Sequence, residues 1–423
     1  MILQIFMYVV IFIMLIVIVI DIIPIARDWL LRIRMGRYGD KFLWNKALTK
    51  KGYKWLLNTP KIKVTDNTRF IVIDMLKGNY TKSAIQHWQE AALLLGLSEY
   101  LKSNEDNQIE NAISKFLSSK FDHIGQWIDK PLHVDGAILA YAVMKLDFID
   151  TDKYKKALDY TWEMIKEHIG EDGTVGYRKS MKNYRYVDTI GFICPFLISY
   201  GIRYKKNECI DLAVKQIKEY EKYGMLQSHN IPCHAYEIKN KTPLGLYGWG
   251  RGLGWFAIGL IDAWNELPQN NKYKCVLEGS VKRFAKAAMS FQQNNGSWNW
   301  TVTREEARPD SSATATLGWL MLNAAKINEI STECIESTER ALGYLIKVTR
   351  RDGSIDFSQG DTKDIGVYSM LFNTLPFTQG FCMRCINLYF NYASTLNKEQ
   401  SKNIDLVKMG DGNEDNRIYS NVQ

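Results

Sequence analysis

The most uniform apolar stretch lies at the start of the chain. Residues 1–20 are apolar except for Gln4, Asp21 interrupts the run, and residues 22–26 briefly resume it. A helix of about 20 apolar residues can cross the hydrocarbon core of a bilayer, which is roughly 30 Å thick. The pattern therefore predicts a transmembrane anchor over residues 1–26.

The charges around this run predict its orientation. No Lys or Arg precedes it and no small-x-small cleavage site follows it, which disfavours a cleaved signal peptide. Arg27, Arg32, Arg34 and Arg37 follow it. Because cytoplasmic flanks carry an excess of Lys and Arg, we expect a single-pass protein of the cell membrane whose bulk lies on the cytoplasmic side.

Past the anchor, apolar residues recur at helical spacing almost throughout. Helices that are apolar on all sides alternate with charged, amphipathic ones. The former are typical of buried helices and the latter of helices that face water. The alternation predicts an all-α fold with six inner and six outer helices, an (α/α)6 barrel; an open solenoid would need a more regular repeat. The predicted helices are 40–57, 82–102, 107–120, 132–146, 152–169, 187–204, 207–223, 251–266, 271–293, 311–328, 333–350 and 378–395.

These patterns divide the chain into four parts. The anchor (1–26) is followed by a basic neck that includes the first outer helix (27–80), a barrel (81–400) and a polar tail (401–423) that we expect to be mobile. Three outer helices end in similar Asx-Gly turns, at 172–173, 295–296 and 352–353, which are typical helix stops.

Composition narrows the class of protein. With 46% hydrophobic and 24% charged residues among 423, the chain is neither largely disordered nor collagen-like. The net charge of +8 is modest and no long Lys/Arg run occurs, so we expect no nucleic-acid partner. The seven cysteines are scattered and odd in number, which favours free thiols. The CxxC at Cys382 and Cys385 lacks a second pair, so buried thiols are a better interpretation than zinc.

Two aspartates are candidate catalytic groups. Asp135 and Asp188 each lie at the start of an inner helix, so both are expected at one mouth of the barrel. Helix capping is the alternative, since Asp is a favoured N-cap. A helix N-terminus lowers the pKa of an Asp, whereas a general acid near neutral pH needs a raised one. Burial or a second carboxylate must therefore outweigh the helix for either residue to act as an acid.

Other polar and aromatic residues precede inner helices. The segment 249–255 does not match a phosphate-binding glycine motif. Arg251 could instead form a bidentate contact with a carboxylate. Trp249 and Trp255 could stack on a sugar or lie in the core. His234 lies in a loop, and Ser312 lies in an Asp-Ser-Ser segment that suits a helix cap. No His pair shows metal-ligand spacing, so we expect no metal site.

These motifs together carry a resemblance. Val-Asp-Gly at 134–136, Val-Asp-Thr at 187–189, Cys-Pro-Phe-Leu at 194–197, His234, Trp-Gly-Arg-Gly-x-Gly-Trp at 249–255 and Asp-Ser-Ser-Ala-Thr-Ala at 310–315 resemble glycoside hydrolase families 88 and 105. These families are the unsaturated glucuronyl and rhamnogalacturonyl hydrolases. The resemblance spans roughly residues 80–395.

The resemblance implies an (α/α)6 barrel without metal or organic cofactor. It also implies removal of a 4,5-unsaturated uronic acid from the non-reducing end of an oligosaccharide, by protonation and hydration of the double bond. Asp188 matches the general acid/base and Asp135 the second carboxylate. His234, Arg251 and Trp255 match positions that line the substrate site, where Trp249 and Ser312 are also expected.

Two other hypotheses stay open. A barrel of this kind could use the two aspartates to cleave ordinary glycosidic bonds of saturated sugars. It could also be a membrane-anchored glycan-binding or assembly protein without catalysis. The presence of both Asp135 and Asp188 argues against the second of these.

Overall fold

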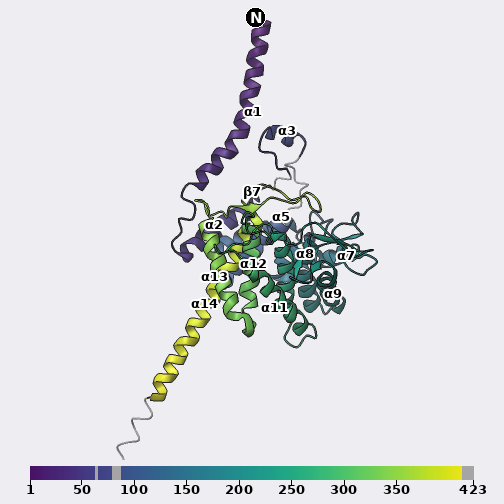
Figure 1. Ribbon diagram of the computed structural model, residues 1–423, viewed down its shortest axis with the longest axis vertical. Coiled ribbons are helices and arrows are strands. Elements are labelled where there is room, and N and C mark those ends of the chain that lie inside the picture. Colours follow the sequence, from purple (N-terminus) through teal and green to yellow (C-terminus); the bar gives the residue numbers. More distant parts are fainter. Residues whose placement is uncertain (62–64, 79–86, 412–423) are drawn as a thin grey trace, which may run out of the picture.

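The computed structural model describes residues 1–61, 65–78 and 87–411, with side chains to residue 394. The start of the predicted helix 82–102 and the last part of the predicted tail, residues 412–423, lie outside this range. The chain is mostly helical (Figure 1). The helices are α1 (Ile2–Arg32), α2 (Lys41–Leu57), α3 (Ile71–Leu76), α4 (His87–Leu101), α5 (Asn107–Lys120), α6 (Gly136–Met144), α7 (Lys155–Lys166), α8 (Val187–Arg203), α9 (Asn207–Tyr223), α10 (Gly250–Glu266), α11 (Lys274–Ser290), α12 (Ser311–Ala324), α13 (Ser331–Lys347) and α14 (Pro376–Asp411).

Six helices form a closed inner ring. Each of α4, α6, α8, α10 and α12 packs against the next, α12 packs against α14, and α14 returns to α4. The intervening helices α2, α5, α7, α9, α11 and α13 lie outside it. The order and alternation are those predicted from the apolar pattern, and the ring closes, which an open solenoid would not do.

Sequence composition explains which helices are inside. All fourteen residues of α12 are buried, whereas α9 buries one face through residues such as Leu212, Ile217 and Tyr220. Glycine lets inner helices approach closely: a Cβ on Gly380 of α14 would lie 2.1 Å from the backbone of Ala92 in α4. The seven cysteines are free, and Cys382 and Cys385 are buried in α14, as predicted for structural thiols.

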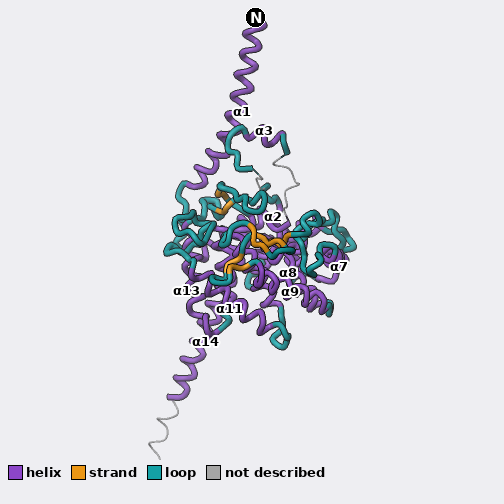
Figure 2. The backbone as a smooth tube through the Cα atoms, turned by 45° about the vertical axis from the view of Figure 1, so that its right-hand side comes forward, coloured by secondary structure: helices purple, strands orange, loops and turns teal. Residues whose placement is uncertain are grey.

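Short strands connect the helices. One sheet has the order β1-β4-β5, with β1 (Tyr184–Tyr186) antiparallel to β4 (Ala235–Glu237) and β4 antiparallel to β5 (Thr242–Leu244). The strand β2 (Met225–Leu226) pairs with β3 (Ile231–Pro232), and β6 (Ser358–Gln359) pairs with β7 (Phe372–Asn373). Figure 2 shows these strands as short orange segments among the helices. β1 and β7 lead into the N-terminal ends of α8 and α14, so these two pairs lie at the mouth of the ring.

The N-terminal apolar helix extends away from the barrel (Figure 1). It runs to Arg32, beyond the predicted boundary at residue 26, with Pro24 inside it. Its mean hydropathy reaches 3.2 over an 18-residue window, and none of that window is buried. It is therefore not a core helix, and its length and composition fit a membrane anchor or a signal sequence.

The C-terminal helix is also longer than predicted. α14 continues from Pro376 to Asp411, whereas the apolar pattern indicated an end at residue 395. Beyond the barrel it projects from the side opposite α1 (Figures 1 and 2). The apolar pattern stops where the helix leaves the barrel, which is why it marked only the buried part.

Candidate active site

Asp135 and Asp188 both lie at the mouth of the inner ring, but neither caps its helix. Asp135 occupies the N-cap position of α6 without a side-chain capping hydrogen bond, and Asp188 lies in the first turn of α8, whose N-cap is Tyr186. Within the described part of the chain, the Oδ2 atom of each is buried without a hydrogen-bond partner. Since a buried polar atom without a partner is costly, these carboxyl groups are candidates for chemistry.

Burial decides the ionisation of both aspartates. It raises the pKa of Asp135 to about 8 and that of Asp188 to about 7, and it outweighs the neighbouring backbone hydrogen bonds and positive charges that favour the ionised forms. The carboxyl group that further raises the pKa of Asp188 is Asp361, and for Asp135 it is Glu90. The raised values thus come mainly from burial, and the neighbouring carboxyl groups are not those of the predicted pair. Asp135 is 2% exposed and the Asp188 side chain 14%, so Asp188 is the more accessible to a ligand.

Strand pairing places His234 beside Asp188. Tyr186 of β1 is opposite Ala235 of β4, and the Val187 amide donates to the His234 carbonyl at 3.0 Å. As a result, His234 Nε2 lies 3.9 Å from Asp188 Oδ2. Gly245, with a φ of +74°, allows the backbone to pass close to the His234 side chain, where a Cβ would lie 2.7 Å from it.

The surroundings of His234 favour its neutral form. Burial, followed by the charge of Arg251, lowers its pKa to about 4. The Gly366 amide donates to Nδ1 at 3.5 Å, so Nε2 carries the ring proton and presents it toward Asp188. The rings of Trp249 and Tyr368 lie 4.7 and 5.5 Å from the imidazole, and this contact fixes its orientation.

Among the described residues, Arg251 is held by backbone carbonyl oxygens and not by a carboxylate. Its guanidinium donates to the carbonyl oxygens of Gln359 and Gly360 at 2.5 and 2.6 Å and lies over the Trp249 ring, 5.3 Å from the centroid. The residue is 1% exposed. The guanidinium of Arg251, which was expected to bind a carboxylate, therefore donates to two backbone carbonyls. Its charge lowers the pKa of Asp188. An anion at the mouth would be attracted to this charge.

Three other predicted site residues are held by the protein itself. Trp249 donates from Nε1 to Gln359 Oε1 at 2.9 Å and forms one wall beside His234. Ser312 donates its hydroxyl to Asp310 at 2.8 Å, and Asp310 caps α12, so the capping interpretation holds there. Trp255 is 2% exposed and its ring lies between Trp88, Phe192 and Phe377 inside the ring of helices.

The structure adds residues that the motifs did not indicate. Tyr177 lies close enough to both aspartates for their charges, after burial, to raise its pKa well above the usual value. Arg178 lowers the pKa of Asp135, and its Nε is buried without a partner among the residues described. Burial raises the pKa of Asp361, whose carboxylate accepts from the Thr362 amide at 3.0 Å. The sequence offered one signal for these residues, the Asp-Gly turn that precedes Tyr177.

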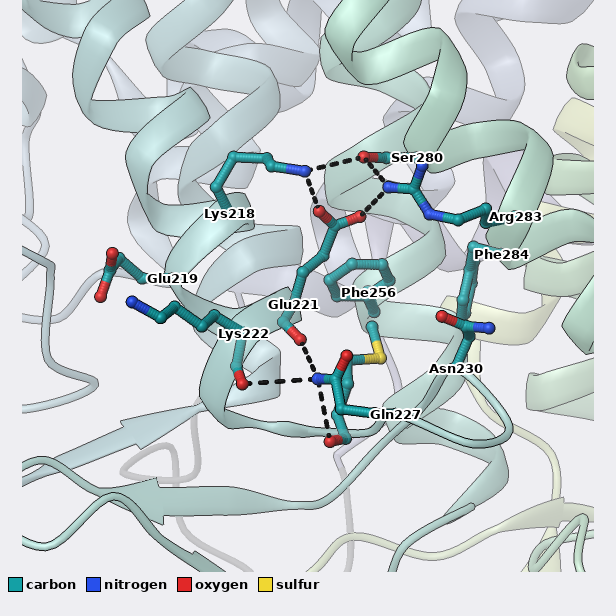
Figure 3. Close-up of a pocket in the computed structure, with 11 residues that line it drawn as sticks. Lys218, Glu219, Glu221, Lys222, Gln227, Asn230, Phe256, Ser280, Arg283 and Phe284 are labelled. Carbon is teal, nitrogen blue, oxygen red and sulfur yellow. Dashed lines mark hydrogen bonds and ion pairs between the residues drawn. The ribbon is translucent and has the colours of Figure 1, made fainter.

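A separate pocket lies between α9 and α11. It has a volume of about 390 Å³, and Figure 3 shows Lys218 and Arg283 pointing toward Glu221, which pairs with both. None of the predicted site residues lines it. Because Glu221 is already paired with both cations and no predicted site residue is present, this pocket is not the candidate catalytic site. Within the described residues, no group of three or more His, Cys, Asp or Glu side chains could hold a metal ion.

Solved structures share this fold. A possible member of the GH105 family from Salmonella enterica serovar Paratyphi A is 17% identical, with 82% of this chain and 94% of that chain covered and a TM-score of 0.70. A family 105 glycoside hydrolase from C. acetobutylicum is 16% identical, with 76% and 98% covered and a TM-score of 0.66. The unsaturated glucuronyl hydrolase from Bacillus sp. GL1, described as responsible for the degradation of glycosaminoglycan, is 13% identical, with 81% and 94% covered and a TM-score of 0.62.

Sequence comparison gives the family. No curated protein matches this chain. The model of Glycosyl Hydrolase Family 88, however, matches residues 62–386, which include all the candidate site residues named above. The chain belongs to glycosyl hydrolase family 88.

Proposed function

We propose that this protein is a membrane-anchored hydrolase that removes a 4,5-unsaturated uronic acid from the non-reducing end of oligosaccharides. One observation carries the proposal: Asp188 is a carboxyl group with a pKa of about 7 at the mouth, beside neutral His234 and within the field of Arg251. A group that is partly protonated at neutral pH suits both a general acid and, after transfer of its proton, a general base.

The chemistry uses each of these groups. Protonated Asp188 gives its proton to C4 of the enol ether, and the positive charge that develops at C5 is shared with the ring oxygen. Water then adds to C5 and returns a proton to the Asp188 carboxylate. The resulting hemiketal opens, and the hemiacetal formed at C1 collapses to an aldehyde with release of the remaining sugar. Atoms and protons balance with water as the only added reactant.

The surrounding residues bind and orient the substrate. The charge of Arg251 attracts the uronate carboxylate, and the Nε2 proton of His234 is directed at the region between the substrate and Asp188. Tyr368 offers a ring face beside His234 for the sugar, and the buried Trp249 supports the imidazole from behind. Tyr177 lies near both aspartates, and a protonated Asp135 can donate a hydrogen bond to the sugar.

The docked end of α1 supports an anchor over a cleaved signal sequence. Arg32 forms an ion pair with Asp356 (Nε–Oδ2 2.7 Å), and Asp28 forms one with Arg350 at 2.8 Å. The Leu31 carbonyl accepts from the Arg351 amide. These contacts join the end of α1 to the folded domain, which supports our proposal that the apolar helix is retained as an anchor, with the barrel on the cytoplasmic side as its flanking arginines predict.

The direct test follows the absorbance of the substrate double bond. Full-length protein in detergent should consume the ultraviolet absorbance of an unsaturated uronyl disaccharide, and Asp188→Asn should abolish this while retaining the far-UV spectrum of the wild type. Unchanged absorbance with both unsaturated glucuronyl and galacturonyl substrates would refute the proposal. Release of reducing ends from saturated oligosaccharides would establish an ordinary glycosidase instead.

A further inference from the structure

A short apolar helix lies against the N-terminal helix at the level of Asp21. The Asp21 carboxylate accepts at 2.7 Å from the amide of Phe70, the N-cap of α3, and at 2.9 Å from the amide of Ile71, the first residue of α3. Asp21 is the residue that ends the apolar run, and the run before it, Ile2–Ile20, is roughly 28 Å long as a helix. If α1 spans the bilayer, Asp21 therefore marks the membrane surface, and α3 starts at the same depth.

The outer face of α3 is strongly apolar. Phe70 is 61% exposed, Met75 54% and Leu76 84%. Exposed Arg69 and Lys77 flank this face. A short amphipathic element with apolar residues outward and cations at its ends is typical of a segment that lies in the lipid headgroup region. The face is continuous with α1, because the two helices are in contact.

The segment before α3 is attached to the loop that forms the active-site mouth. Asp66 accepts from the Ser369 hydroxyl at 2.7 Å and the Met370 amide at 3.3 Å, and pairs with Lys363 at 3.4 Å. The same loop carries Gly360, which binds Arg251, and Tyr368, which contacts His234. The neck is thus fixed to the rim of the site and not to the far end of the barrel.

The end of α1 docks on the same rim. Asp356, which pairs with Arg32, precedes β6, and Asn373, which donates to Asp28 at 2.9 Å, precedes α14. Figure 1 shows α1, α3 and β7 on one side of the barrel and the free end of α14 on the other. The helix from Asp21 to Arg32 rises roughly 17 Å, which sets the distance between this rim and the end of the apolar run.

From these contacts we propose that α3 rests on the bilayer that α1 enters, and that the mouth of the active site faces the membrane. The partner of this surface is a lipid bilayer with anionic headgroups. One consequence of this proposal rests on the proposed function. If the mouth faces the membrane, the unsaturated oligosaccharide is presented from the membrane, attached to a lipid or held close to the headgroups. A gap of this size accommodates a glycan of a few sugars.

Site-specific fluorescence tests the surface without reference to activity. Leu76→Cys and Val9→Cys, each in a Cys275→Ser background, place a polarity-sensitive probe on α3 or within α1. The wild-type Cys275, which is exposed beside the C-terminal end of α10, places the probe at the opposite end of the barrel. The labelled full-length proteins are reconstituted in phosphatidylcholine–phosphatidylglycerol vesicles that contain a spin-labelled lipid as quencher.

We expect the probe at Leu76 to be quenched at least roughly twofold more than the probe at Cys275, and the probe at Val9 to be quenched as well. Quenching at Val9 without quenching at Leu76 would overturn the inference and leave the anchor intact. Equal quenching at Leu76 and Cys275 would show a barrel lying on its side, and would also overturn it. No quenching at Val9 would overturn the anchor and the inference together. Leu76 is exposed, so its replacement does not disturb folding, and a Met370→Cys probe gives an independent measurement on the rim.

The consequence for the substrate has its own measurement. The same unsaturated disaccharide is supplied free in solution or linked to a phospholipid through a short spacer, and turnover by the full chain in vesicles is compared. We expect kcat/KM to be on the order of tenfold higher for the lipid-linked form, because confinement raises its effective concentration at the mouth. Equal values would overturn the membrane-presented substrate, whereas loss of both activities would refute the proposed hydrolysis itself.

Discussion

Two sets of buried carboxyl groups occupy the inner ring, and their surroundings differ. Asp262 in α10 is 1% exposed and accepts hydrogen bonds from Arg384 of α14 and Trp319 of α12, both at 2.9 Å. Asp135 is 2% exposed, yet its Oδ2, like that of Asp188, has no partner among the described residues. Asp262 and Asp135 are about equally buried, but within the described part of the chain only Asp262 has side-chain partners at both oxygens. This difference distinguishes a carboxylate that joins helices from a carboxyl group that stays available for a ligand.

The pairing of Asp262 explains the difference in role. Its partners come from two other helices of the ring, α12 and α14, so these contacts connect α10 to elements that are distant in sequence. At the mouth, the cation that lowers the pKa of Asp188 is Arg251, whose Nη1 and Nη2 donate to the carbonyls of Gln359 and Gly360. The backbone around Gln359 and Gly360 thus holds Arg251 where its charge lowers the pKa of Asp188, although no ion pair joins the two among the described residues.

The largest effect is expected at Asp188. Replacing it with Asn removes the proton donor and should lower kcat by about 10²–10⁴-fold, the usual contribution of general acid–base catalysis, with little change in stability. Single-turnover absorbance measurements give the rate, and urea unfolding of the full chain gives the stability. Activity within a factor of a few of wild type would rule out Asp188 as the acid.

Asp262 should give the opposite result. Asp262→Asn leaves the buried guanidinium of Arg384 without its counter-charge, and we expect the free energy of unfolding to fall by about 3–5 kcal/mol. Urea unfolding measures the loss, and kcat per folded molecule should stay close to that of the wild type. A full loss of kcat with unchanged stability would show that the distinction between the two regions is wrong.

How much of this contrast the sequence could predict depends on the kind of contact. The six hairpins follow from periodicity because each inner helix, such as α12, is apolar on every side. The positions of Asp135 and Asp188 follow from helix starts. The hydrogen bonds of Arg251 and the position of Asp361 at the site could not be predicted in this way. Both depend on β6 and the loop after it, where no periodicity indicates which backbone atoms face α10. The contact of α3 with Asp21 could not be predicted either. Its two hydrogen bonds join residues that are separated by 49 and 50 positions, and such a contact produces no local pattern in the sequence.

Burial also explains where the sequence was ambiguous. Asp310, Asp135 and Asp188 all lie at helix starts, but only Asp310 accepts the backbone hydrogen bond of a cap, from the Ser312 amide at 2.9 Å. Helix-start position alone therefore could not separate a cap from a catalytic group. The outcome depends on the depth of each carboxyl group, which is set by packing of the whole ring.

Asp135 offers a smaller, pH-dependent effect. Its pKa is about 8 in the folded state, above the value of 3.8 for an exposed Asp, so the folded protein binds the proton more tightly and the wild type loses stability as pH rises from about 4 to about 8. Asp135→Asn has no proton to lose, so its stability relative to the wild type should be greater at pH 8 than at pH 5 by a few kcal/mol. Urea unfolding at both pH values measures this. A wild type that is relatively more stable at pH 8 than at pH 5 would contradict the raised pKa.

The smallest effect should come from Asp361, and it sharpens the assignment of Asp188. Asp361 raises the pKa of Asp188, and it is the weakest of the influences on that group. Because protonated Asp188 is the active form, kcat/KM should fall as pH rises through about 7, and Asp361→Asn should move this fall to lower pH by roughly a few tenths of a unit. Asp364→Asn, a change of the same kind in the same loop, is the matched control, since the charge of Asp364 acts on His234 and Tyr186. A shift of the falling limb with Asp364→Asn but not with Asp361→Asn would mean that the titrating group is not Asp188, because the two carboxylates act on different neighbours.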